Sequence, residues 1–153
     1  MKRIEVKLAL PIVAPLLDVI RGMADGLRQS LAAPLGQCDV DAEFDAAWTH
    51  GLLAAQGGDV QALLGLFNEE FFAEGVIAFD EDNAEPIVRA TAAVRLRLRD
   101  HYLKPLGDEA LETGKVDLEK LEEPLRRAFM CYLFMATIQE LIIQHLDASI
   151  LES

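Results

Sequence analysis

The sequence predicts an all-α, single-domain helical bundle of about five helices over residues 1–153, with room for a minor two-stranded ribbon. Apolar residues recur at helical spacing over long segments, and 153 residues, of which 52% are hydrophobic, suit one core. The segment AFMCYLFMATI is apolar around the whole circumference of a helix. Such a helix belongs at the centre of a bundle or at a subunit interface.

The first elements are a strand and a helix. Residues 3–9 alternate polar and apolar side chains, and charges interrupt this stretch, so we interpret it as structural and not as a signal peptide. A helix then runs from Pro11 or Pro15 to about residue 33. Its predicted inward stripe is Ile12, Leu16, Ile20, Met23, Leu27 and Leu31. Its predicted solvated stripe is Asp18, Arg21, Asp25 and Arg28.

Two further helices follow. Asp39 or Asp41 caps the first, which ends at the glycine pair 57–58. Its apolar stripe is Phe44, Trp48, Leu52 and Ala55. Asp59 caps the second, which ends near Gly75. Its inward residues are Val60, Leu63, Leu64, Phe67 and Phe71.

The second half of the chain begins with a short β-branched segment, GVIAF at 75–79, which is the candidate partner of the first strand. Asn83 is the favoured cap of a long helix, because this start places Pro86 in the first turn. That helix reaches about Lys104 and is ended by Pro105.

The last part predicts a loop over 105–117, a short helical prelude in LEKLEE and a final helix from Pro124 to Asp147. Polar residues leave one wet stripe at the carboxyl end of this final helix. The stripe consists of Thr137, Glu140, Gln144 and Asp147.

Arginine occupies every second position in VRLRLRDHY, residues 94–102. On a helix that turns by about 100° per residue, Arg95 and Arg99 lie between two apolar strips. The first strip is Ile87, Thr91, Val94, Leu98 and Tyr102, and the second is Ala92, Leu96 and Leu103. Arg97 instead joins Arg89, Asp100 and Lys104 on the predicted solvent face.

A guanidinium between apolar strips requires an anion, because an unpaired one would cost several kcal/mol. Internal ion pairs are the favoured interpretation. The candidate carboxylates are Glu69, Glu70, Glu74, Glu119, Glu122, Glu123 and Glu140. The carboxylate or phosphate of a ligand would suit the same planar fork. The candidate ligand-binding residues are therefore Arg95, Arg99, His101 and Tyr102.

The sequence shows no residue spacing typical of a metal site, a calcium loop or a catalytic group. His50, His101 and His145 stand singly, without the Glu-x-x-His spacing of bundle metal sites, and the acidic run 80–85 lacks a calcium-loop pattern. We therefore assign no catalytic residue, no metal ligand and no cofactor. Cys38 and Cys131 have no zinc-site or disulfide-framework spacing, which fits a reduced cytoplasm, and Cys131 is expected in the core.

Charge and hydrophobicity point to a class of partner. The formal net charge of -12 disfavours nucleic acid and anionic membranes. The apolar excess favours self-association or binding to another protein. The leading hypothesis is a cytoplasmic, non-enzymatic interaction or adaptor-type module, most simply a homo-oligomer. The alternative is a protein that binds a small anion or metabolite, with or without enzymatic activity, in an arginine-lined pocket between helices.

Two stretches, VRLRLRDHYL (94–103) and YLFMATIQELIIQHL (132–146), carry a resemblance, with a looser one in DAEFDAAW (41–48). They resemble the Arg-Leu and Gln-Glu helices of an uncharacterised, all-helical bacterial domain-of-unknown-function family. In actinobacteria the gene of that family is often found beside the gene for the ClpS protease adaptor. The family has no assigned activity, so the resemblance implies a helical fold and no site residues.

Overall fold

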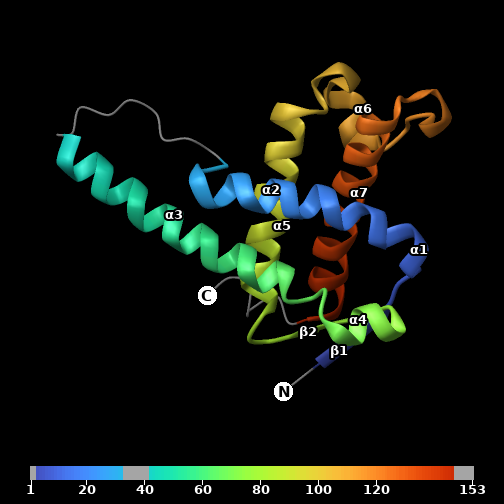
Figure 1. The fold of residues 1–153 in the computed structure, drawn as a ribbon, viewed down its shortest axis with the longest axis horizontal. Helices are drawn as coiled ribbons and strands as arrows, with labels where there is room; N and C mark the ends of the chain where they lie inside the picture. The colour runs from blue at the N-terminus through green and yellow to red at the C-terminus, as the bar shows by residue number, and fades with distance from the viewer. Residues whose placement is uncertain (1–2, 33–41, 147–153) are drawn as a thin grey trace.

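The structure, a computed structural model, describes residues 3–32 and 42–146, without the side chains of 42–45. It confirms the predicted helical bundle with a minor two-stranded sheet. The described residues form four long helices (Figure 1), namely α2 (Leu17–Gln29), α3 (Ala42–Leu64), α5 (Ala84–His101) and α7 (Glu123–His145).

The centre of the bundle is the pair α5 and α7, which pack side by side, while α2 lies across both helices and α3 lies across α5 (Figure 1). Helix α7 contributes buried residues around most of its circumference, among them Phe129, Cys131, Met135 and Ile138. This confirms the central position predicted for it. Of its predicted wet stripe, Thr137, Glu140 and Gln144 are exposed, and Asp147 lies outside the described residues.

Helix α2 is preceded by two short helical segments, α1 (Leu10–Val13) and η1 (Ala14–Leu16). Leu16, Ile20, Met23 and Leu27 of the predicted inward stripe are buried, and the predicted solvated stripe is exposed. Ile12 is 59% exposed, so its predicted inward position is wrong. That prediction assumed one continuous α-helix. The 3₁₀ segment between α1 and α2 turns by a different angle per residue, so Ile12 does not lie on the same side as the buried residues of α2.

The minor sheet pairs β1 (Arg3–Lys7) with β2 (Val76–Asp80) in antiparallel orientation. Ile4 lies opposite Phe79 and Val6 opposite Ile77, so the apolar positions of both strands share the face that meets the core. The predicted pairing of the N-terminal strand with the segment at 75–79 is thereby confirmed.

Helix α3 is continuous through the glycine pair at 57–58, so the predicted break and the predicted cap at Asp59 are wrong. Neither glycine has a positive φ, and each takes part in the helix. Contacts on both sides of the pair hold the helix together, as described below. The predicted caps Asp39 and Asp41 lie outside the described residues.

The segment after α3 differs from the predicted helix over 59–75. The chain turns after Leu64 and starts again as α4 (Glu69–Glu74), because Asn68 accepts a hydrogen bond from the backbone N–H of Phe71 at 3.2 Å. Helix α4 ends at Gly75, as predicted, with a φ of 74°. Val60, Leu63, Phe67 and Phe71 are buried as expected, and Leu64 is half-buried.

The link between α5 and α7 is also partly helical. It contains η2 (Lys104–Leu106), α6 (Gly107–Thr113) and η3 (Leu118–Lys120). The prediction of a loop over 105–117 is therefore wrong, because α6 buries Leu111 against the core. The predicted prelude is confirmed by η3. Asn83 precedes α5, but its side chain accepts from the N–H of Asp80 and does not cap the helix.

Candidate functional site

Arg95 lies between α5 and α7, and its contacts with the described residues are all with neutral groups. Its Nη1 donates to Oε1 of Gln139 at 2.7 Å and its Nη2 to the hydroxyl of Tyr132 at 3.1 Å. The guanidinium also lies 4.6 Å from the centroid of the Tyr132 ring, a cation–π arrangement. Its Nε is buried without a hydrogen-bond partner among the described residues. The predicted ion pair of Arg95 is wrong for every carboxylate that the structure describes.

Arg99 has a carboxylate partner, Asp108 at the start of α6. This hydrogen bond is the largest cause of the raised pKa of Arg99. Asp108 is not among the predicted partners, and it lies in the segment that was predicted to be a loop. The pair borders a small cavity of about 220 Å³, which Asp100 and Lys104 also line. Two cations and two carboxylates therefore face the same space and balance in charge.

The other two predicted ligand-binding residues lie elsewhere. His101 is exposed at the end of α5. Tyr102 is 46% exposed and lines a different cavity of about 300 Å³ between α2 and the start of α7. Arg95, Arg99 and Tyr102 thus occupy three separate environments. The second apolar strip is wrong at two positions, since Ala92 and Leu96 are exposed while Leu103 is buried.

The sequence predicts Arg97 on the solvent face, but in the structure this side chain is half-buried against the end of α2. Its Nη2 donates to the hydroxyl of Ser30 at 2.9 Å, and its guanidinium lies over Gly26, where an added Cβ would come within 3.1 Å of it. Ser30 is the residue that ends α2. A cation at the carboxyl end of a helix stabilises the unpaired carbonyls there, so Arg97 acts as a cap for α2.

A feature that the sequence interpretation missed is the amino-terminal half of α3, residues 46–58, which we call the arm. The carboxyl half of α3 buries Val60 and Leu63, whereas the arm extends past α5 at the edge of the molecule (Figure 1). Trp48 is 53% exposed, Leu52 is 38% exposed and Ala55 is also exposed, so the predicted apolar stripe of this segment faces solvent at each position that the structure describes. The side chain of Phe44 lies outside the described residues.

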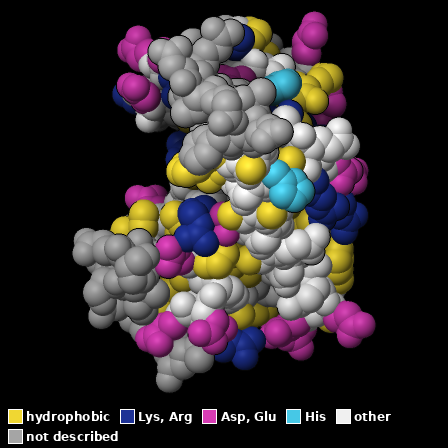
Figure 2. Space-filling model, turned by 90° about the vertical axis from the view of Figure 1, so that its left-hand side faces the viewer, with side chains coloured by type: hydrophobic (Ala, Val, Ile, Leu, Met, Phe, Trp, Pro, Cys, Tyr) yellow, Lys and Arg dark blue, Asp and Glu magenta, His cyan; other side chains and the backbone are white. Residues whose placement is uncertain are grey.

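The arm contains no Asp, Glu, Lys or Arg, although 26% of the chain is charged. Most of its residues are exposed, and only Thr49, Leu53 and the pair 56–57 are half-buried. Figure 2, which looks at the molecule from the side of the arm, shows acidic side chains mostly at the margins of that face. An exposed helical segment normally carries charged residues on its solvent side. The absence of charged residues from 46–58 is the feature of the sequence that could have identified the arm as a surface of this kind.

Two sets of polar contacts hold the base of the arm. The side chain of Gln56 donates to the carbonyl oxygens of Leu27 at 2.5 Å and Ser30 at 3.0 Å, and it accepts from the N–H of Ala32 at 3.1 Å. It thereby satisfies backbone groups at the carboxyl end of α2. This contact fixes the arm to α2 next to the glycine pair.

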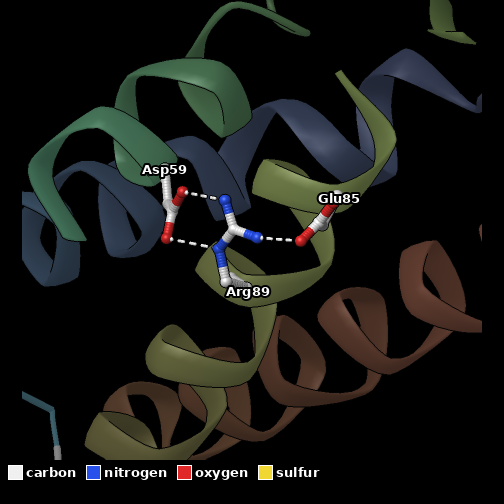
Figure 3. A network of polar contacts seen from close by, with 3 residues as sticks. All are labelled: Asp59, Glu85 and Arg89. Carbon is white, nitrogen blue, oxygen red and sulfur yellow. Dashed lines mark hydrogen bonds and ion pairs between the residues drawn. The ribbon is translucent and has the colours of Figure 1, made fainter. Parts of the chain in front are cut away.

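The second contact joins α3 to α5 (Figure 3). Nε and Nη2 of Arg89 donate to the two carboxylate oxygens of Asp59 at 3.0 and 2.9 Å, and Nη1 donates to Glu85 at 2.6 Å. The hydrogen bond to Asp59 is the main cause of the raised pKa of Arg89. A bidentate pair of this kind fixes both position and orientation. Asp59 therefore anchors the arm to α5 and does not begin a new helix.

Other kinds of site were sought among the described residues. No group of three or more His, Cys, Asp and Glu side chains is placed to hold a metal ion within that part of the chain. No described helix combines the length and apolar character that crossing a membrane requires.

Comparison of the chain with protein-family models, curated proteins and solved structures finds no significant match. The resemblance to a bacterial domain-of-unknown-function family therefore stays a prediction. Any function has to be argued from the residues of this chain.

Proposed function

We propose that this protein is a cytoplasmic, non-enzymatic helical module that binds protein, including a second copy of itself, through the arm of α3. The observation that carries the proposal is the charge-free exposed surface of residues 46–58. Burying an apolar, uncharged helix face releases water at no cost in charge desolvation. A partner helix is the simplest complement to such a face.

The net charge of -12 supports the arm as the place of self-association. Two copies repel each other wherever their acidic surfaces approach. A charge-free segment that extends from the molecule lets two copies meet where this repulsion is weakest. The anchors at Gln56 and Asp59 support the same function, because they fix the arm in one orientation before any partner arrives.

The alternative of anion or metabolite binding by Arg95 and Arg99 has less support. Arg99 is neutralised by Asp108, and the cavity beside it balances two cations with two carboxylates. Arg95 is stacked on Tyr132 and is not among the residues that line that cavity. An adaptor role, which is part of the same hypothesis, would use the arm in the same way.

Sedimentation velocity over a dilution series tests the proposal. We expect wild type to associate reversibly and Leu52→Lys to weaken association about tenfold or more, since it places a charge on the apolar face. Lysine lowers the net negative charge, so greater overall repulsion cannot explain a loss. The matched control is Ile143→Lys, at a residue of α7 that is 56% exposed. A wild type that stays monomeric throughout, or equal effects of both substitutions, would overturn the proposal.

A further inference from the structure

The two strands of the minor sheet each have an outer edge, which faces away from the partner strand. In an antiparallel sheet, hydrogen-bonded and non-hydrogen-bonded residue pairs alternate along the strands. The N–H of Leu8 donates to the carbonyl oxygen of Gly75 at 2.7 Å, so every second residue counted back from Leu8 bonds to β2. The residues between them point their backbone N–H and C=O groups to the outer edge of β1. These residues are Arg3, Glu5 and Lys7.

The outer edge of β2 is closed by the side chain of Asn83. Its Oδ1 accepts from the N–H of Asp80 at 2.8 Å, and its Nδ2 donates to the carbonyl oxygen of Ala78 at 3.3 Å. Both groups belong to the outer edge, because Ala78 and Asp80 lie opposite Glu5 and Arg3 in the register. Asn83 therefore makes hydrogen bonds that a further strand would otherwise make on this side of the sheet.

The outer edge of β1 has no such closure. The backbone N–H and C=O groups of Glu5 and Lys7 have no hydrogen-bond partner among the described residues, and both residues are exposed. Figure 1 shows β1 at the margin of the molecule. An edge of this kind is a template for an added strand. A sheet of only two strands also gains stability from a third.

The side chains of β1 determine which sequence suits this edge. Ile4 and Val6 lie on the core face and are half-buried at the edge of the sheet. An added strand would cover them best with apolar, β-branched residues directly opposite, since such cross-strand pairs stabilise a sheet.

The charges on the other face of β1 are unequally neutralised. Arg3 lies 3.6 Å from Glu5 and 3.8 Å from Glu70, so its charge is already compensated. Lys7 forms no ion pair with any carboxylate that the structure describes. An acidic residue opposite Lys7 would complement this charge.

We infer that the outer edge of β1 binds an extended peptide segment of a partner protein by strand addition. The segment runs antiparallel to β1, with β-branched residues opposite Ile4 and Val6 and an acidic residue opposite Lys7. In this mode of recognition the main-chain hydrogen bonds supply affinity, and alternate side chains supply specificity. This site is separate from the arm of α3 and goes beyond the function proposed for it.

A second copy of β1 suits this edge less well. Full antiparallel overlap of two β1 strands would set Arg3 against Lys7 of the other copy and Glu5 against its own counterpart, so like charges would meet at every charged position. It would also place both bodies, each with a net charge of -12, on the same side of the joined sheet. A short peptide avoids this repulsion.

Fluorescence anisotropy with labelled peptides tests the inference. The probe is EVTVT, whose glutamate lies opposite Lys7 and whose central threonine lies opposite Glu5. We expect EVTVT to bind about tenfold more tightly than KVTVT, which differs only in that charge. Methylation of the central threonine nitrogen removes a hydrogen bond to β1 and should weaken binding about tenfold. The matched control is methylation of the first valine nitrogen, which points away from β1 and should have little effect.

Variants of the protein test the same edge. Lys7→Glu should reverse the preference, so that KVTVT binds more tightly than EVTVT. The matched control Lys115→Glu changes the net charge equally at an exposed residue of the link before α7, and should leave the preference as it is. Glu5→Pro removes an N–H of the outer edge but none of the bonds to β2, and should abolish binding.

Three results would overturn the inference. They are a failure of EVTVT to bind, equal binding of the two peptides, and equal effects of the two methylations. A sedimenting mass of wild type that falls on Glu5→Pro would mean that a second copy covers the edge, which also contradicts it. Leu52→Lys should leave peptide binding unchanged, so failure of the arm proposal and failure of this one are distinguishable.

Discussion

Arg95 illustrates how a partly buried cation is accommodated without an ion pair. Its Nη atoms donate to an amide oxygen and a phenol oxygen, and the Tyr132 ring supplies the negative face that a carboxylate would otherwise provide. A neutral cradle of this kind avoids the desolvation of a second charge. At the scale of single residues, Arg89 connects α5 to α3, Arg99 connects α5 to α6, and Arg97 covers the carboxyl end of α2.

Cys131 gives a prediction at the same scale. Burial raises the pKa of its thiol from 9.0 to about 12, so it stays protonated at neutral pH. In a Cys38→Ser background we expect a disulfide reagent to modify Cys131 only as fast as the chain unfolds. Above pH 9.0 the unfolded chain loses this proton while the folded chain retains it, so the free energy of unfolding falls as pH rises. Rapid modification without denaturant would contradict the burial.

The helices show what a sequence pattern can and cannot predict. Apolar spacing predicted α2, α5 and α7, because periodicity reports a buried face directly. Apolar spacing could not predict that α3 continues through residues 57–58. A glycine pair on its own favours the end of a helix, and the contacts of Gln56 and Asp59 that keep α3 continuous are made with other helices. The partner of Arg99 was missed for a related reason, because Asp108 belongs to α6, whose seven residues are too short for a periodic signal.

Gly57 and Gly75 form a matched pair for testing the helix boundaries. Gly57 has helical conformation and open space at Cβ, so Gly57→Ala should raise the free energy of unfolding by about 0.5–1 kcal/mol. Gly75 has a φ of 74°, and an added Cβ would lie 2.7 Å from the carbonyl oxygen of Leu8. Gly75→Ala should therefore lower it by about 1–3 kcal/mol. Denaturant unfolding of dilute protein measures both changes. A destabilising Gly57→Ala would contradict a continuous α3 and support the helix break that the sequence predicts.

At the scale of the whole molecule, charge and apolar surface are distributed unequally. The net charge of -12 is carried outside the arm, which has no formally charged residue at neutral pH. The apolar excess of the composition predicted an interaction surface, but an apolar stripe looks the same in a sequence whether it is covered or exposed. Whether the stripe is covered depends on where the arm lies relative to α5, and that position is set by contacts between residues far apart in the sequence.

This distribution predicts the salt dependence of self-association. Raising the ionic strength to about 0.1 M or more shortens the Debye length to roughly 10 Å or less and screens the repulsion between the acidic bodies. We therefore expect the sedimenting mass of wild type to increase with salt at fixed protein concentration, while Leu52→Lys stays largely monomeric. Dissociation on adding salt would mean that ion pairs hold the copies together, contrary to a charge-free interface.

Self-association through a single arm, as proposed, would also limit the growth of the assembly. When a surface binds its own copy about a two-fold axis, the contact uses the same patch on both molecules and leaves nothing free for a third. A patch that instead met a different surface on its neighbour would leave an open end at every step and lead to filaments. If two copies meet through the arm of α3 about such an axis, as we propose, the contact closes on itself, and we expect particles of two chains at any protein concentration.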